Sequence, residues 1–140
     1  MIRRGFREFA TQTLGGSLIL KVDMFIRFEN QVLQSALVDE LHRSAIPFTT
    51  DNDGGLRFDG VDEAAVVNAI HKIRDAQFPW YFLKWPLESH SVRFRGVLEE
   101  SGLPFFVEYH DSGTWFLVRR ADQPQLDRLS QTLVDSVDYI

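Results

Sequence analysis

The sequence predicts an α+β fold made of two tandem βαββα units, and two observations lead to it. Residues 24–48, an apolar strand, an amphipathic helix and the start of another strand, line up with residues 81–105 at a constant offset of 57 residues (81 minus 24). A short glycine-containing turn follows in each copy, and such turns join antiparallel strands. The identical pairs are Phe25 and Phe82, Leu41 and Leu98, Ser44 and Ser101, Pro47 and Pro104, and Phe48 and Phe105.

The chain accordingly divides into an N-terminal arm at residues 1–16, a first βαββα unit at 17–78 and a second at 79–140. We expect the two units to form one compact body, because a single unit buries little surface alone. The arm shows a weak helical pattern between Phe6 and Leu14. Because it is short, we expect a packed or frayed segment rather than a membrane or transit segment.

The first unit opens with an apolar stretch at 17–28, which predicts one long strand or two short ones. Asn30 is a good N-cap for the amphipathic helix that follows it. Pro47 ends this helix, because the residue before a proline avoids the helical conformation. A hairpin at 48–59 around Asp53-Gly54-Gly55, and a helix capped by Asp62, complete the unit.

The second unit repeats this order. Residues 80–85 predict a strand, and either Ser89 or Ser91 is expected to cap a shorter helix. Gly102 fits the left-handed position after that helix, where the first unit carries Ala45 at some steric cost. The remaining elements are a hairpin at 105–120 around Asp111-Ser112-Gly113 and a last helix that begins near Asp122 in a capping box with Gln125.

A βαββα unit followed by a further strand has the element order of a ferredoxin-like fold, with the helices on one face of an antiparallel sheet. The strand at 80–85 is compatible with three places: it completes the first unit, opens the second, or links the two into one six-stranded sheet. We expect a pseudo-two-fold pair of units that share one continuous or closely packed sheet.

The sheet face away from the helices differs between the two units, because successive strand side chains point to opposite faces. In the first unit this face is polar, with Thr49, Asp51, Arg57 and Asp59. In the second it is apolar, with Phe106, Glu108 and His110 beside either Trp115 and Leu117 or Phe116 and Val118. Such a face needs a cover, for which the N-terminal residues, a second copy or a bound partner are the candidates.

Composition excludes several classes of protein. With 44% hydrophobic and 25% charged residues, the chain resembles ordinary soluble globular domains. The net charge of −5, without a basic stripe, argues against nucleic acid as a partner. The absence of cysteine excludes disulfides and thiolate metal sites. Lys21 and Asp23 interrupt the apolar stretch at 17–28, so we expect neither a signal peptide nor a membrane span, and a cytoplasmic location by default.

One polar cluster carries the residue types of a catalytic or metal site. Glu108 and His110 share a strand face, Asp111 follows at the turn, and His90 could approach them. Imidazole and carboxylate groups bind metals and transfer protons. However, the sequence has no HExxH spacing, no GxSxG and no phosphate-binding loop. We therefore interpret these residues as ordinary turn residues and predict no catalytic residue, no metal site and no cofactor.

The run LEESGLPFFVEYHDSGTWFLV, residues 98–118, resembles the helix, turn and hairpin of small bacterial signal-transducing, PII-like modules. The βαββα order is similar to that of ACT-type regulatory domains. The resemblance implies a module that binds a small effector or a protein without catalysis. Both hairpins are too short for a PII-type nucleotide loop, and the glycine of ACT domains after the first strand has no counterpart, so no functional residues are carried over.

The sequence thus predicts a non-catalytic regulatory or interaction module that binds a protein partner or small effector through the sheet face of the second unit and forms a homodimer. The residues of that face are Phe106, Glu108, His110, Trp115 and Phe116. The alternative is a small metal-dependent or hydrolase-like enzyme centred on Glu108, His110 and Asp111. An enzyme is expected to show a concave polar pocket with perturbed titration, whereas an interaction module is expected to show a flat apolar patch.

Overall fold

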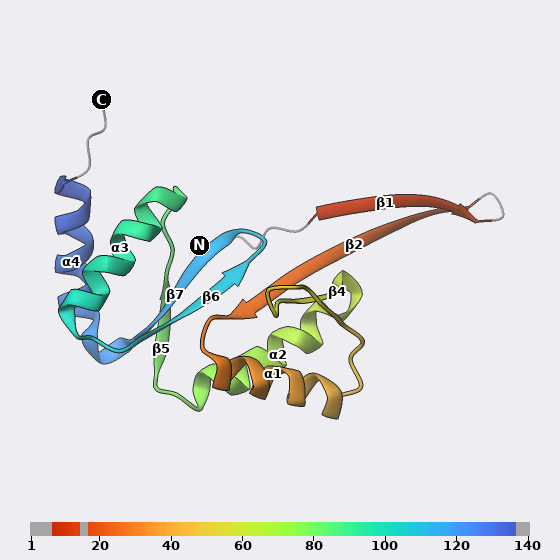
Figure 1. The fold of residues 1–140 in the computed structure, drawn as a ribbon, viewed down its shortest axis with the longest axis horizontal. Helices are drawn as coiled ribbons and strands as arrows, with labels where there is room; N and C mark the ends of the chain where they lie inside the picture. Colours follow the sequence, from red (N-terminus) through yellow and green to blue (C-terminus); the bar gives the residue numbers. More distant parts are fainter. Residues whose placement is uncertain (1–6, 15–16, 137–140) are drawn as a thin grey trace.

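Six strands form one antiparallel sheet in the order β3-β4-β2-β6-β7-β5, and a seventh strand, β1, pairs with the first part of β2 (Figure 1). The computed structural model describes residues 7–14 and 17–136, with side chains from residue 23 onward. The predicted α+β class and antiparallel sheet are confirmed. The strands are β1 (Arg7–Leu14), β2 (Ser17–Phe28), β3 (Thr49–Thr50), β4 (Leu56–Asp59), β5 (Trp80–Leu83), β6 (Phe105–His110) and β7 (Gly113–Arg119). The helices are α1 (Gln31–Arg43), α2 (Glu63–Asp75), α3 (Glu88–Ser101) and α4 (Gln123–Ser136), with 3-10 turns η1 (Gly60–Asp62) and η2 (Arg120–Asp122).

Local sequence chemistry sets the ends of α1. The side-chain oxygen of Asn30 accepts hydrogen bonds from the backbone N–H groups of Val32 and Leu33, at 2.9 and 3.1 Å, as an N-cap does. After the helix, Ala45 adopts a φ of 56°, in the left-handed region that costs an L-residue energy. Gly102, at the matching position after α3, has a φ of 75°. The predicted N-cap and the predicted strain at Ala45 are therefore both confirmed.

The start of α3 differs from the prediction. Neither Ser89 nor Ser91 caps the helix, since the N-cap residue is Leu87 and the helix begins at Glu88. A tertiary contact decides this start, because the Glu88 carboxylate accepts a hydrogen bond from the Thr114 hydroxyl of β7 at 2.5 Å. Ser91 lies instead inside the helix and is buried.

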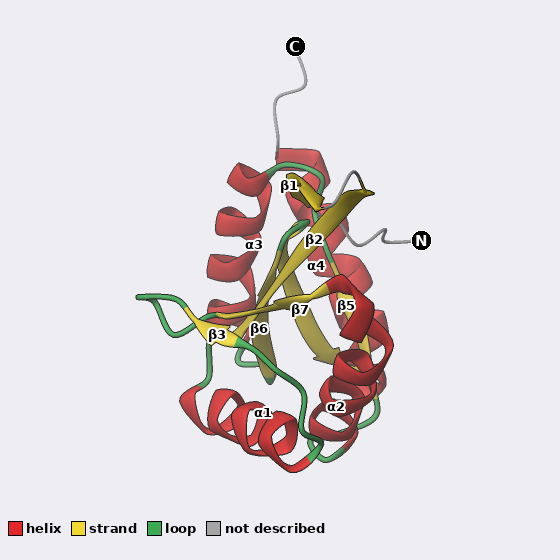
Figure 2. Ribbon diagram, turned by 90° about the vertical axis from the view of Figure 1, so that its right-hand side faces the viewer, coloured by secondary structure: helices red, strands yellow, loops and turns green. Residues whose placement is uncertain are grey.

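The two helix pairs cover opposite faces of the sheet, which corrects the prediction that all helices lie on one face. Within each half the strand order is the same, β3-β4-β2 and then β6-β7-β5, but β6 runs antiparallel to β2, so every strand direction is reversed. A half-turn about an axis across the strands relates two such arrangements, and this turn exchanges the faces. Figure 2 shows α1 and α2 on one side of the strands and α3 and α4 on the other.

The hydrophobic core is divided in the same way. Alternate residues of β6 point to the two faces. Phe106 packs into the core under α1 and α2, whereas Val107 belongs to the core under α3 and α4. The strand β5 pairs with β7 at the far edge of the sheet, while β6 occupies the place beside β2. Of the three places compatible with the sequence, β5 therefore opens the second half.

A long hairpin projects from this body. β1 pairs with Ser17–Asp23 of β2, and Figure 1 shows both strands reaching away from the helices and the other strands. We call residues 7–14 and 17–22 the projecting hairpin. The predicted helical pattern of the N-terminal arm is wrong for Arg7–Leu14, because this segment pairs with β2 as a strand. The rest of the arm, residues 1–6 and 15–16, lies outside the described residues.

Candidate functional site

The predicted polar cluster is buried and is built around an ion pair between the two halves. Glu108 of β6 is fully buried, and its two carboxylate oxygens accept hydrogen bonds from Arg74 of α2, from Nε at 2.9 Å and from Nη2 at 2.7 Å. His110 Nε2 lies 2.8 Å from Oε1 of the same carboxylate. Burial raises the pKa of Glu108, but the hydrogen bonds from His110 and Arg74 outweigh it and hold the pKa below 4.5.

Aromatic rings enclose this cluster. The His110 and Trp115 ring centroids lie 4.4 Å apart, and Trp115 contacts Phe82 edge-on at 4.7 Å. The Arg74 guanidinium lies 4.3 Å from the centroid of the Phe82 ring, within the range of a cation–π contact. Charged and aromatic groups together therefore form a closed layer between α2 and the strands of the second half.

The structure brings together three of the five residues predicted to form an open binding face, Glu108, His110 and Trp115, but buries all three. Of the two pairs of β7 residues that the sequence allowed on this face, the structure places Trp115 and Leu117 beside Glu108. Phe106 is half-buried and stacks on Phe78. The remaining residue, Phe116, lies in the opposite core against Phe94. The expectation of an open face is corrected, because α2 of the first half covers it.

The third member of the predicted enzyme site, Asp111, has a different structural role. Its Oδ2 accepts a hydrogen bond from the backbone N–H of Phe25 at 2.9 Å. Along this edge of β2, the pairing with β6 ends at Ile26 and the pairing with β1 starts at Asp23. Asp111 therefore satisfies a backbone amide of β2 in the gap between β6 and β1. Among the described residues, no group of three histidine or acidic side chains could hold a metal ion.

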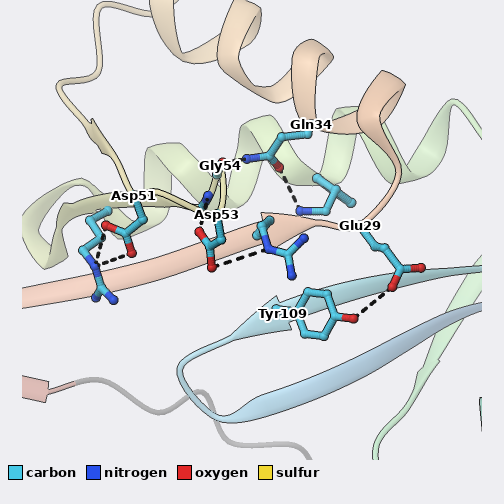
Figure 3. Close-up of polar contacts among 10 residues, drawn as sticks. Glu29, Gln34, Asp51, Asp53, Gly54 and Tyr109 are labelled. Atoms are coloured by element: carbon cyan, nitrogen blue, oxygen red, sulfur yellow. Dashed lines mark hydrogen bonds and ion pairs between the residues drawn. The ribbon is translucent and has the colours of Figure 1, made fainter. Parts of the chain in front are cut away.

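A second polar cluster lies on the other face of the first half, on the side of the strands away from α1 and α2 (Figure 3). Arg57 donates from Nε to Asp51 at 2.9 Å, and Arg27 lies 3.8 Å from Asp53. The Arg27 guanidinium also lies over the Tyr109 ring, 4.4 Å from its centroid. The prediction that this face is polar is therefore confirmed. Figure 3 labels Asp51 and Asp53 of the hairpin turn and marks with dashed lines their interactions with Arg57 and Arg27.

The same cluster continues to α3 through Glu29. The Tyr109 hydroxyl donates to Glu29 at 2.9 Å, and Arg95 of α3 donates to the same carboxylate at 2.7 Å. The hydrogen bond from Arg95 holds the pKa of Glu29 below its ordinary value, whereas burial, with the bond to Glu29, raises that of Tyr109. Sequence analysis missed this link, since no local pattern connects residues 66 positions apart. Because each of these arginines is matched by a carboxylate, we interpret the cluster as structural.

Comparison of the chain with protein-family models, with curated proteins and with solved structures finds no match. Within the described ranges, no helix has the length and apolar character required to cross a membrane. The fold defines an α+β protein, and the ionisable groups of its two polar clusters are engaged with one another. The feature without a described structural partner is the projecting hairpin.

Proposed function

We propose that this chain is a non-catalytic interaction module and that the projecting hairpin is the element that contacts its protein partner. One observation carries this proposal: among the described strands, β1 pairs only with β2, and Ser17–Val22 of β2 pair only with β1. An isolated two-stranded hairpin is at best marginally stable in water and needs further strands or packing. A binding partner supplies that packing, and the hairpin gains order when it binds.

The hairpin replaces the sheet face of the second half as the proposed binding element. That face is closed by α2 and by the Arg74–Glu108 ion pair, so it offers a partner little accessible surface. A direct role of Phe106, Glu108, His110, Trp115 and Phe116 in binding stays a prediction, as do effector binding and a cytoplasmic location.

The enzyme alternative finds no support in the geometry of its proposed centre. Both Glu108 oxygens accept hydrogen bonds from Arg74, and His110 Nε2 is directed at the same carboxylate. Asp111 accepts a hydrogen bond from a backbone N–H of β2. A general acid or base must reach a substrate proton, and these groups are committed to one another instead.

We also propose that the chain arose by duplication of a βαββα unit and that its binding role is regulatory. The identical order of strands within the halves, β3-β4-β2 and β6-β7-β5, supports a duplicated βαββα unit. The half-turn that places the helix pairs on opposite faces superposes the units only together with a shift across the sheet, so a pseudo-two-fold screw replaces the expected pseudo-two-fold axis. The resemblance to PII-like and ACT-type modules also favours a regulatory binding role.

Photo-crosslinking tests the binding element without assuming the identity of the partner. A photo-reactive amino acid replaces Lys21 in the hairpin of the full chain, expressed in cells of its source organism. The matched control carries it at Val92 of α3, a side chain that is 66% exposed on the body of the protein. We expect a discrete crosslinked protein species at Lys21 that is absent at Val92. Equal, diffuse crosslinking at the two positions would overturn the proposal.

A further inference from the structure

The strand β2 has one edge that is closed along its length and one that is open. On the closed edge, β6 pairs with residues 26–28 and β1 with residues 17–23, and the side chain of Asp111 accepts the N–H of Phe25 between them. On the other edge β4 pairs only with residues 23–26. From Ser17 to Val22, no described strand lies on this second edge.

The backbone groups on the open edge are those of the even-numbered residues. Glu29 and Phe25 direct their N–H groups towards the closed edge, to Val107 and Asp111. Successive residues of a strand direct their backbone groups to alternate edges. The register of β2 is continuous, since the irregularity in the hairpin falls on β1 between Glu8 and Thr11. Leu18, Leu20 and Val22 therefore present N–H and C=O groups to the open edge.

The other edges of the sheet carry features that oppose pairing with another chain. β3 has only two residues, Thr49–Thr50. β5 has four residues and follows directly on Pro79, and a proline cannot donate a backbone hydrogen bond. β1 carries the irregularity described above, which bends an edge. Natural proteins use short strands, prolines and bulges to protect edges, so the unprotected segment of β2 is the exception among the described strands.

We propose that two copies of the chain pair antiparallel through the open edge of β2, about a two-fold axis that passes between the two Ile19 residues. This inference rests on the proposed interaction role of the hairpin and names its partner as a second copy. Antiparallel pairing of a segment with itself is isologous, so both copies satisfy the same groups at once. Two marginal hairpins become one four-stranded sheet, β1-β2-β2-β1, and a sheet of three or more strands can be stable where two are not.

The end of β4 fixes the register. Asp59 pairs with Asp23 on the open edge, so the second copy cannot extend its pairing to Asp23. An axis at Leu20 would place Ser17 of the second copy opposite Asp23, in the position that Asp59 occupies. An axis at Ile19 places Leu18 opposite Leu20, so that even-numbered residues exchange hydrogen bonds, and ends the pairing at Lys21.

Single-cysteine variants test this register, because the chain has no cysteine of its own. With the axis at Ile19, the two Ile19 residues form a non-hydrogen-bonded pair whose Cα atoms are about 4.5 Å apart, within the range of a disulfide. Ile19→Cys is therefore expected to form a disulfide-linked dimer under mild oxidation. The control on the same strand is Lys21→Cys, whose two copies lie four residues apart, or about 13 Å. Val92→Cys, on an exposed side chain of α3, measures random collision.

We expect Ile19→Cys to oxidise at least about a hundredfold faster than Val92→Cys at micromolar protein, since a millimolar effective concentration replaces the bulk concentration. Unmodified protein is expected to sediment at twice 16.2 kDa. A mass of 16.2 kDa at all concentrations would overturn the two-fold pairing. Oxidation of Ile19→Cys that is no faster than oxidation of the two control variants would overturn it as well. If Lys21 then still crosslinks to a different protein, the interaction role survives; if it crosslinks to nothing discrete, both proposals fail.

Discussion

Arg74 and Glu108 form a buried, bidentate ion pair that joins α2 of the first half to β6 of the second. Their side chains are 6% and 0% exposed, and the two N–O distances are 2.9 and 2.7 Å. Removing one partner of a buried ion pair leaves an uncompensated charge inside the protein, which is costly. The pair therefore couples the stability of the halves, and its loss affects both.

We expect Glu108→Leu to lower the free energy of unfolding by about 3–5 kcal/mol, because it leaves the Arg74 charge buried. The double variant Arg74→Met, Glu108→Leu is expected to regain much of this loss, although His110 loses its partner. Urea denaturation monitored by tryptophan fluorescence measures these differences. The control is Lys72→Met, which removes an ion pair with Glu40 at the surface and is expected to have a far smaller effect. A double variant with a lower free energy of unfolding than Glu108→Leu would contradict this account of the pair.

The depressed pKa of Glu108 predicts loss of stability in acid. In the unfolded chain this carboxyl binds a proton near pH 4.5, whereas in the folded protein it does so only at lower pH. Between these two values the unfolded state binds more protons, so stability falls as the pH falls. The contribution is fully present above about pH 4.5 and is lost as the pH drops through the folded pKa.

Measuring the free energy of unfolding against pH in wild type and Glu108→Gln checks this contribution. The variant is expected to be less stable at neutral pH and to show a flatter acid slope. Glu29→Gln is the control, because the pKa of Glu29 is depressed in the same direction at a more exposed site, so its slope should change less. An acid slope that Glu108→Gln leaves unchanged would mean that other groups govern acid unfolding.

The sequence was sufficient for features set by neighbouring residues. The Asn30 cap, the left-handed conformation at Ala45 and the hairpin turn after Asp51 follow from side-chain and backbone chemistry within a few positions. The start of α3 was not predictable in this way, because the contact between Glu88 and Thr114 joins residues 26 positions apart. Tertiary contacts override local capping preference when they bring a polar partner to the helix start.

The candidate site could be predicted only as a set of residues on one strand face. Strand alternation correctly placed Glu108 and His110 together, but the assumption that all helices lie on one side left that face open. The pairing of Ile26 with His110 turns the second half over, which brings α2 onto the face instead. This pairing joins strands far apart in the sequence, and the alternation pattern along a strand contains no information about it.

Ala45→Gly is expected to stabilise the protein by up to about 1 kcal/mol. The left-handed conformation costs an L-residue about 1–2 kcal/mol, and the greater freedom of glycine in the unfolded chain offsets part of that gain. Thermal denaturation measures the change. Ala36→Gly, at an exposed position within α1, is the matched control and is expected to lose about 1 kcal/mol. If both substitutions destabilise the protein to the same extent, the conformation at Ala45 carries no cost.

Gly55→Ala is expected to destabilise the protein through a clash with Phe25. Gly55 is buried beneath the Phe25 ring, and a Cβ atom there would lie 2.2 Å from Cε1 and 2.4 Å from Cζ of that ring, and 2.9 Å from Asp53 Oδ1. The ring must move from its place under the Arg57 guanidinium, 5.1 Å from its centroid. Overpacking of this kind costs about 1–3 kcal/mol. Gly96→Ala, within α3 and with no heavy atom within 4 Å of the added Cβ, should instead stabilise the protein by about 0.5–1 kcal/mol.

A double-mutant cycle separates the clash from any effect on the turn itself. In the Phe25→Ala background the ring is absent, so Gly55→Ala should cost much less than in wild type. The turn hydrogen bonds, from the Gly55 N–H to Asp53 and from the Asp51 N–H to the Gly55 carbonyl, involve no atom of Phe25, so we expect them in both backgrounds. Equal losses in the two backgrounds would show that Gly55 is required by the turn or by Asp53, and that the Phe25 ring adapts at no cost.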